Sequence, residues 1–535
     1  MSPDHDTRDS AAGKVHAGFP LFMTLIVMLF ILRGIQIQCL YPPLEGPDEY
    51  QHVAYLIYLA EHHRLPVYGE SFVPKSLYPD LVANPHCAYD WEQTRWIGCR
   101  QYSDFYDSPQ RIESSPDIIL YEAQHPPLYY LVFAPMFRYL ENRSGFRAAV
   151  YTLRIVNIIT AAIALAFLAY PAVAVFNDKR TARGAILAVS LSPMFLINAS
   201  RITNDALMLL FASVSFFLLL KLHQGRHQVM RSVLVGLLAG LAIQTKMIAL
   251  CLPPLILWYV FFLALRGILS WRRSIGCAAA AFAACVLVCV PYGAFSLRHY
   301  ETLIPSQMTI MQDIACEPGL LMDKVESSHI LDFFLGILVR DNLWISGWSF
   351  LAPHKMLIVI YFLLIFIPSF GIFKHLYKAA RRRAGFGQII SPPVALFATL
   401  VASSFSLTYL NMLGNILTYG FINIPPYYVM IAYPALIICV FACSRAFGSV
   451  ILTMNISCLA VIFYVTELHS LLLVGVPHWA DSRNVAVIFR RLSAVHPAFP
   501  GPVFFFPAAV AVVITIFFIL VHLIFGKEPR QDCRS

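Results

Sequence analysis

The chain has 535 residues, of which 58% are apolar and only 13% are charged, and its mean hydropathy is +0.66. One soluble core cannot bury so much apolar surface, so the composition excludes a soluble protein. The formal net charge of +9 does not form one basic face. Lys and Arg gather in short clusters between apolar stretches, as in membrane proteins that keep basic loops on the inner side, and we therefore expect no nucleic-acid partner.

Apolar stretches long enough to cross a bilayer recur from Phe19 to Phe525. Each has roughly 17–25 residues, and we count about twelve of them. In lipid such segments satisfy their backbone hydrogen bonds as helices, so a barrel is not favoured. The first run, Phe19–Leu40, is too long for a signal peptide and lacks small residues at its end. The sequence predicts an all-α polytopic membrane protein with about twelve transmembrane helices.

The loops alternate between short basic ones and long ones. With the N-terminus inside, the basic clusters fall on the cytoplasmic side, together with both termini. Three long loops then face outside, at about 41–148, 296–354 and 467–501. We expect residues 1–17 to form a cytoplasmic tail and residues 18–535 to form a single transmembrane module, whose large first outer loop contains interfacial helices.

Two of the twelve cysteines differ from the rest in their setting. Most fall in apolar spans, where a thiol is usually a small buried hydrophobe. Cys87 and Cys99 lie in the first outer loop, where an oxidising compartment would permit a disulfide between them. The spacing of Cys and His matches no structural zinc site.

An acidic segment, Gly46-Pro47-Asp48-Glu49, follows the first span. Gly46 is expected as the N-cap and Pro47 as the first residue of a short interfacial helix that runs to about His63. Helical spacing then places Asp48 on the polar face with His52, and Glu49 above the apolar stripe. Asp48 is the better candidate for a polar cavity. The alternative is that both acids only favour the positive end of the helix dipole.

Further polar residues are expected at the same membrane face, and each has a structural alternative. His125 precedes two prolines at a helix entry, and Asn204-Asp205 is typical of a helix cap. Lys246 and Arg298 lie near the ends of later spans, where a basic side chain often extends to the interface. Together they place acids and bases around one mouth, which no single alternative explains.

These residues resemble a known family. The order Pro-x-x-Glu-Gly-Pro-Asp48-Glu49, His125-Pro-Pro-Leu-Tyr-Tyr, Asn204-Asp205 and Gly236-x-x-x-Gly-Leu-x-x-x-Thr-Lys246 is similar to the GT-C superfamily of glycosyltransferases, which includes protein O-mannosyltransferases and lipid A aminoarabinose transferases. A later segment, Trp344-Ile-Ser-Gly-Trp348, resembles bacterial members. The chain departs from the family at Asn423-Ile-Pro-Pro-Tyr-Tyr428, which lacks the Arg of a basic motif.

The resemblance implies transfer of a hexose or pentose from a polyprenyl-phosphate donor to an acceptor hydroxyl, with inversion, at the outer face of a membrane, the bacterial inner membrane in our interpretation. The acceptor would be a glycan, a lipid or a protein. A lipid phosphate is a stable leaving anion, so one carboxylate base, Asp48, would suffice. No cofactor is implied with certainty. Asp205 could hold a divalent cation, and no residue is assigned as a metal ligand.

The resemblance also gives roles to the residues at the mouth. Asp48 and Glu49 would be catalytic, with Glu49 in support. The substrate-binding candidates are His52, His125, Asn204, Asp205, Lys246 and Arg298.

Two other classes of protein fit the same features. A transporter or flippase of a lipid-linked or small polar substrate also has many spans with charges near their ends. Against it, charges within the expected spans are few, Arg33 being the main exception, and the hydropathy shows no repeated halves. A non-catalytic assembly factor would keep the fold without the activity, and replacing Asp48 by Asn would then leave its phenotype unchanged.

Overall fold

The computed structural model describes residues 18–46, 48–84, 87–90, 95–98, 117–222, 224, 227–305, 341–343, 353–381, 391–419 and 426–525. The expected tail, Cys99 and the Trp344–Trp348 segment lie outside these residues. Only the backbone of Cys87 is described, so the expected disulfide stays a prediction.

The protein is a multi-pass helical membrane protein. In the described residues nine helices are long and apolar enough to cross a membrane, or ten if one bent pair counts as a span. Two shorter apolar helices, α9 (Asp205–Leu220) and α20 (Tyr433–Ser444), add to them, and the expected count of about twelve is not confirmed. The long helices are α1 (Gly18–Gln38), α6 (Phe146–Phe176), α10 (Gln228–Thr245), α11 (Leu252–Leu265) with η4 (Met247–Cys251), α12 (Trp271–Tyr300), α16 (Lys355–Ser369) with α17 (Gly371–Arg381), α19 (Pro392–Tyr419), α21 (Ser449–His469) with η10 (Ser470–Gly475) and α22 (Val476–Ala480), and α24 (Phe505–Phe525) with η11 (Pro502–Phe504).

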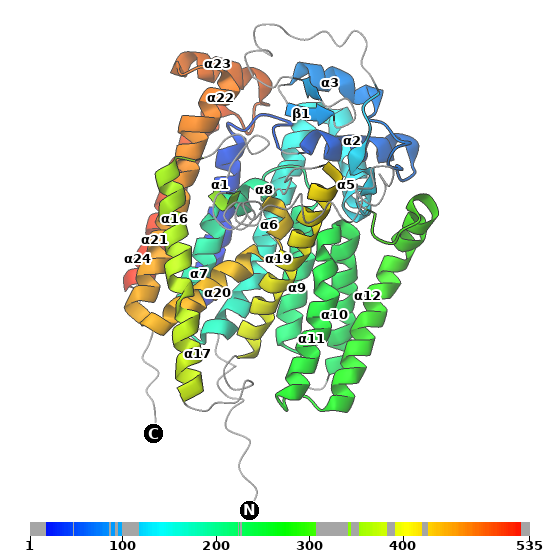
Figure 1. The fold of residues 1–535 in the computed structure, drawn as a ribbon. Helices are drawn as coiled ribbons and strands as arrows, with labels where there is room; N and C mark the ends of the chain where they lie inside the picture. The colour runs from blue at the N-terminus through cyan, green and yellow to red at the C-terminus, as the bar shows by residue number, and fades with distance from the viewer. Residues whose placement is uncertain are drawn as a thin grey trace, which may run out of the picture.

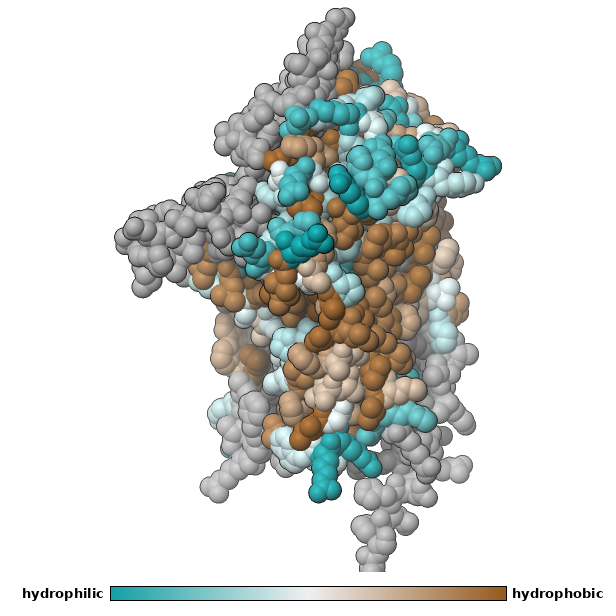
Figure 2. All heavy atoms as spheres, turned by 90° about the vertical axis from the view of Figure 1, so that its right-hand side faces the viewer, coloured by the Kyte–Doolittle hydropathy of each residue, from teal (hydrophilic) through white to brown (hydrophobic). Residues whose placement is uncertain are grey.

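The surface has the pattern of a bilayer-embedded protein. Figure 2 shows a hydrophobic belt around the middle of the molecule, with hydrophilic residues above and below it. Large apolar side chains are exposed along the long helices, among them Leu287 and Val290 of α12. We expect the side chains of such a belt to contact the hydrocarbon chains of the lipid.

The elements outside the bundle gather mainly at the end that carries α2 (Glu49–His62), which lies at the top of Figure 1 and which we call the α2 end. Among them, an antiparallel hairpin, in which Cys87 pairs with Gly98, is a departure from the expected all-α fold. Beneath α2 a separate apolar cluster packs against α5 and α6, so the described parts of the first long loop are folded. The other elements outside the long spans are η2 (Lys75–Leu77), α3 (Tyr78–Ala83), β1 (Cys87–Asp90), β2 (Arg95–Gly98), η3 (Tyr121–Gln124), α5 (Leu128–Ser144), η7 (Asp341–Leu343), η8 (Pro426–Val429), η9 (Arg445–Phe447) and α23 (Val485–Val495).

One span is broken within the bundle. α7 (Lys179–Leu191) and α8 (Pro193–Ala199) meet at 59°, at a proline that has no backbone N–H to continue the helix. Arg33 of α1 donates to the freed carbonyl oxygens of Ser190 and, at 3.0 Å, Leu191. The same guanidinium forms a fully buried ion pair with Glu467 of α21. The charge that the sequence places inside the first span is therefore paired at a helix break.

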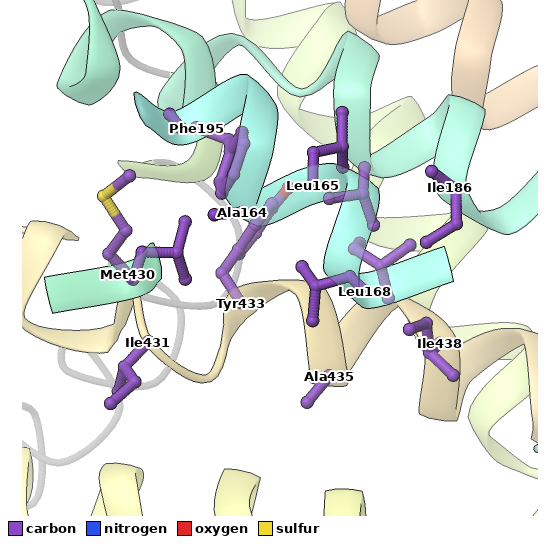
Figure 3. Packing of buried hydrophobic residues seen from close by; sticks show 14 of the residues in the cluster. Ala164, Leu165, Leu168, Ile186, Phe195, Met430, Ile431, Tyr433, Ala435 and Ile438 are labelled. Atoms are coloured by element: carbon purple, nitrogen blue, oxygen red, sulfur yellow. The ribbon is translucent and has the colours of Figure 1, made fainter. Parts of the chain in front are cut away.

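One part of the main apolar core lies between α6, α7, α8 and α20. Figure 3 shows the Tyr433 ring of α20 seated among Ala164, Leu165 and Phe195. All are buried. This packing fixes the broken span against α6, and α8 leads directly into the loop that carries the candidate site.

The glycine motif before Lys246 is explained by helix packing. A Cβ atom built on Gly236 would collide with the carbonyl oxygen of Ala281 in α12, and one on Gly240 would lie 2.7 Å from the Cβ atom of Val288. Small residues four apart let two membrane helices approach closely. The motif therefore sets where α10 ends and where Lys246 is held.

Candidate active site

Asp48 and Glu49 do not share the first turn of α2. Asp48 is the N-cap, with φ 57° and ψ 5°, and the helix begins at Glu49. The expectation that Gly46 is the N-cap and Pro47 the first helical residue is therefore wrong, and Pro47 itself lies outside the described residues. A left-handed backbone is uncommon for a residue other than glycine, although Asp and Asn tolerate it best. It sends the two neighbouring carboxylates in different directions.

Glu49 faces the bundle and is fully buried. Its Oε1 accepts from Arg154 Nε at 2.8 Å and its Oε2 lies 2.5 Å from Arg154 Nη2. Oε1 also accepts from the backbone N–H of Ile202 at 2.7 Å. Both carboxylate oxygens are thus engaged with the protein.

Arg154 is the centre of this network, and sequence reasoning missed it. Besides Glu49, its guanidinium donates to Gln38 Oε1 at 3.0 Å and to the carbonyl oxygens of Tyr41 at 3.2 Å and Pro42 at 2.8 Å. It thereby ties the end of α1 and the start of α2 to α6. Of the two arginines in the 31-residue apolar helix α6, Arg154 is the one that lies beyond the first turn, and this was the available signal.

Asp48 keeps a different environment. Its side chain is partly exposed, and the hydroxyl of Tyr121 donates to its Oδ1. Burial raises the pKa of Tyr121 well above its ordinary value, and the nearby Asp48 charge adds to this effect. The tyrosine therefore remains a hydrogen-bond donor that orients the carboxylate.

The segment before Asp48 is held from the far end of the chain. Trp479 of α22 donates through Nε1 to Glu45 Oε1 at 3.0 Å, and its ring meets Tyr41 edge-on with centroids 5.2 Å apart. All three side chains are buried. The position of Asp48 thus depends on α22 as well as on α6.

The loop between α8 and α9 is fixed by side chains from three helices. Gln38 of α1 donates to the Ser200 carbonyl oxygen at 2.5 Å. Asn157 of α6 donates to the carbonyl oxygens of Arg201 at 2.8 Å and Thr203 at 3.3 Å. Together with the Glu49 contact to the Ile202 N–H, this pairing orders the loop and places α9 beside α2.

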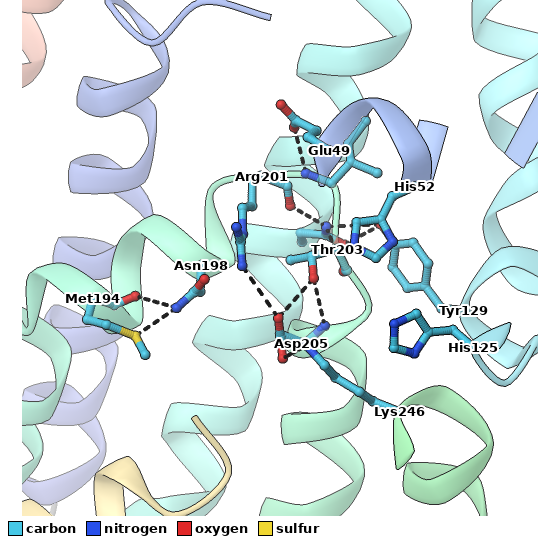
Figure 4. Close-up of polar contacts among 12 residues, drawn as sticks. Glu49, His52, His125, Tyr129, Met194, Asn198, Arg201, Thr203, Asp205 and Lys246 are labelled. Atoms are coloured by element: carbon cyan, nitrogen blue, oxygen red, sulfur yellow. Dashed lines mark hydrogen bonds and ion pairs between the residues drawn. The ribbon is translucent and has the colours of Figure 1, made fainter. Parts of the chain in front are cut away.

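Asp205 and Lys246 meet at the α2 end, as the sequence predicts. Asp205 Oδ1 lies 2.7 Å from Lys246 Nζ, and both side chains are buried. Asp205 Oδ2 accepts from the Thr203 hydroxyl at 2.9 Å and lies 3.9 Å from Arg201 Nη2. Figure 4 shows Arg201 and Lys246 on either side of the Asp205 carboxylate. Two cations therefore surround one anion.

A third group joins His52, His125 and Glu122. Glu122 Oε2 lies 2.9 Å from His125 Nε2 and 3.6 Å from His52 Nδ1, which is also 2.7 Å from the Tyr130 hydroxyl. Burial lowers the pKa of His52 to about 4, so this ring is neutral at pH 7. Burial alone would raise the pKa of Glu122, but His125, His52 and Lys246 together lower it. Glu122 was missed from the sequence, although it lies three residues before His125.

Two other expected residues do not join these ion pairs. Arg298 lies in the last turn of α12 with an exposed side chain, and Asn204 is fully buried at the start of α9. Within the part of the chain that the structure describes, no three His, Cys, Asp or Glu side chains are grouped so as to hold a metal ion. Asp205, considered for a divalent cation, is paired with Lys246.

Residues 124–294 match the family model of the dolichyl-phosphate-mannose-protein mannosyltransferases. The chain is similar to the GT-C glycosyltransferases. The matched region contains His125, Arg154, Asp205 and Lys246, whereas Asp48 and Glu49 lie before it. No curated protein matches the chain in sequence.

Solved structures of two kinds of protein are similar to this chain at low sequence identity. The Archaeoglobus fulgidus oligosaccharyltransferase in complex with Zn and sulfate has 13% identity and a TM-score of 0.46, covering 83% of this chain and 52% of its own. The present chain thus spans about half of that protein. ArnT from Cupriavidus metallidurans bound to undecaprenyl phosphate has 16% identity and a TM-score of 0.44, covering 95% of this chain and 74% of its own. The archaeal oligosaccharyltransferase AglB from Archaeoglobus fulgidus, in complex with an inhibitory peptide and a dolichol-phosphate, has 14% identity and a TM-score of 0.45. The match covers 96% of the present chain and 56% of the AglB chain.

Proposed function

We propose that the protein is a membrane glycosyltransferase that moves a sugar from a polyprenyl-phosphate donor to an acceptor hydroxyl at the outer membrane face, with Asp48 as the base. The observation that carries the proposal is the different use of two adjacent carboxylates. Glu49 is buried and holds Arg154, whereas Asp48 is partly exposed and oriented by Tyr121.

A general base needs access to the proton that it removes. Asp48 has that access in part, and its backbone stands in a conformation that proteins usually keep only where the surroundings enforce it. Here the enforcing contacts are those of Arg154 and Trp479 on the segment before it. The geometry supports Asp48 as the base and Glu49 as its support.

The reaction is a single displacement. The acceptor oxygen attacks the anomeric carbon as Asp48 removes the hydroxyl proton, and the bond between that carbon and the phosphate oxygen breaks. The electron pair leaves with the lipid phosphate, which is stable as an anion and needs no general acid. One displacement at one carbon gives inversion.

The donor phosphate is assigned to the cations around Asp205. Arg201 and Lys246 both lie beside the Asp205 carboxylate, in a poorly hydrated place. Cations fixed in such surroundings stabilise developing negative charge better than they do in water. Arg298, exposed at the same end, is assigned to an outer contact with donor or acceptor.

The proposal is tested with purified protein and radiolabelled polyprenyl-phosphate sugars. Wild type should release or transfer label from at least one donor, and Asp48→Asn should lose transfer while it still binds that donor. The Asn variant keeps the size of the side chain and tolerates the left-handed backbone. Full transfer by Asp48→Asn would overturn the base assignment, and a wild type that binds no donor would overturn the function.

A further inference from the structure

A buried amide stands without a partner in the middle of the candidate site. Asn204 is the N-cap residue of α9, and its side chain makes no capping hydrogen bond. The side chain is fully buried, and neither Nδ2 nor Oδ1 has a hydrogen-bond partner. An unsatisfied buried polar group costs about 1–3 kcal/mol, so natural proteins seldom keep one without a use.

Another buried asparagine of the site shows the usual arrangement. Asn157 donates to the carbonyl oxygens of Arg201 at 2.8 Å and Thr203 at 3.3 Å, and its Oδ1 accepts from the Tyr129 hydroxyl at 3.3 Å. These contacts hold the loop that ends at Asn204. The buried amide of Asn157 therefore holds the loop, whereas the buried amide of Asn204 makes no hydrogen bond within the protein.

The neighbours of Asn204 belong to the proposed donor site. Thr203 and Asp205 on either side belong to the group that pairs with Lys246. Figure 4 shows this group directly below Glu49 and His52, at the α2 end. A ligand whose phosphate is bound by Lys246 would bring its adjoining group to the start of α9.

The hydrogen-bonding chemistry of the Asn204 amide indicates which chemical group of the ligand it can bind. Nδ2 donates two hydrogen bonds and Oδ1 accepts. A phosphate oxygen can only accept, and would leave Oδ1 unpaired. A sugar hydroxyl both donates and accepts, and two neighbouring hydroxyls can pair with both ends of the amide. We propose, on the basis of the proposed function, that Asn204 is a specificity-determining residue that binds hydroxyl groups of the transferred sugar.

The proposal separates ligand recognition from folding. Asn204→Leu replaces the amide with an apolar group of similar size and removes no hydrogen bond within the protein. It should leave the thermal stability of the ligand-free protein unchanged or higher. The matched control is Asn157→Leu, which loses three contacts and should lower the melting temperature. A fall for Asn204→Leu as large as that for Asn157→Leu would give Asn204 a structural role and overturn the proposal.

Binding is measured by thermal shift in detergent with three probes. These are bare undecaprenyl phosphate, undecaprenyl-phosphate hexoses and pentoses, and their monodeoxy forms. Bare undecaprenyl phosphate should bind wild type and Asn204→Leu equally. The best sugar-loaded lipid should bind the variant roughly ten- to a hundredfold more weakly, and one monodeoxy form should bind wild type as weakly as it binds the variant.

The outcomes distinguish the two proposals. Equal binding of every sugar-loaded lipid to wild type and Asn204→Leu, or no gain of sugar-loaded over bare lipid in wild type, overturns the role of Asn204. Sugar-dependent binding that is lost in the variant, with no transfer by wild type, overturns the proposed reaction alone. A wild type that none of the probes stabilises overturns both.

Discussion

The Glu49 carboxylate and the Arg154 guanidinium form a two-point ion pair, with contacts of 2.8 and 2.5 Å, in which neither side chain is exposed. The pair joins α2 to α6 across 105 residues of sequence. Such a pair is costly to break from one side, because the remaining charge stays buried without its partner.

Removing one member of this pair should therefore destabilise the protein by about 3–5 kcal/mol. We expect Glu49→Gln and Arg154→Met each to lower the melting temperature and the yield of folded protein, and the double variant to recover part of the loss. Thermal unfolding in detergent measures this. A stable Glu49→Gln protein that lacks only transfer would instead make Glu49 the base.

Tyr121→Phe should slow transfer without unfolding the protein. The phenol hydroxyl donates to Asp48, and its loss leaves the carboxylate less well oriented, which should lower kcat roughly tenfold with little change in KM. The control is Tyr139→Phe on the exposed face of α5. Unchanged kcat in the Tyr121 variant would show that the hydroxyl does not orient the base.

The buried His52 makes stability depend on pH. Its pKa is about 4 in the folded protein against 6.5 when exposed, so the unfolded chain binds the proton more readily. The contribution is present above pH 6.5 and is lost as the pH falls towards 4, by an amount of order 3 kcal/mol at most. His496, also lowered to about 4 by burial, acts in the same direction. Melting temperatures between pH 4 and 7 should fall less steeply for His52→Asn than for wild type, and the exposed variant His63→Asn should follow wild type.

Arg33 and Glu467 should be strongly coupled. Arg33→Met leaves Glu467 unpaired and also frees the carbonyl oxygens of Ser190 and Leu191 at the helix break. A double-mutant cycle with Glu467→Leu should give an interaction of about 0.5–3 kcal/mol in thermal unfolding. Additive effects of the two substitutions would show that the ion pair does not hold the break.

The features that the sequence predicted correctly are local. The apolar runs predicted the helical spans, and the segment after the first span predicted a short helix that ends at His62. The sequence placed Asp205 and Lys246 near span ends on one side of the membrane, and the structure brings the two side chains together. The hydrophobic periodicity of the sequence and the alternation of short basic and long loops were sufficient for these predictions.

The features that were missed depend on partners far apart in the chain. No local pattern shows that Arg154 meets Glu49, or that Glu122 lies between two histidines. The N-cap was misplaced because the Gly-Pro pair before Asp48 is typical of a helix start, whereas contacts from Arg154 and Trp479 hold that segment outside the helix. Tertiary contacts here outweigh local preference.

The contact between Glu45 and Trp479 has a consequence for biosynthesis. A ribosome that adds about 5–20 residues per second needs roughly 20–90 s to make the stretch between the two residues. During that time the acidic segment has already left the ribosome, but Trp479, which holds this segment together with Arg154, has not yet been made. We expect the site to be completed only after α22 has been inserted, so a nascent chain arrested before Trp479 would hold the segment before Asp48 by its Arg154 contacts alone and would be inactive.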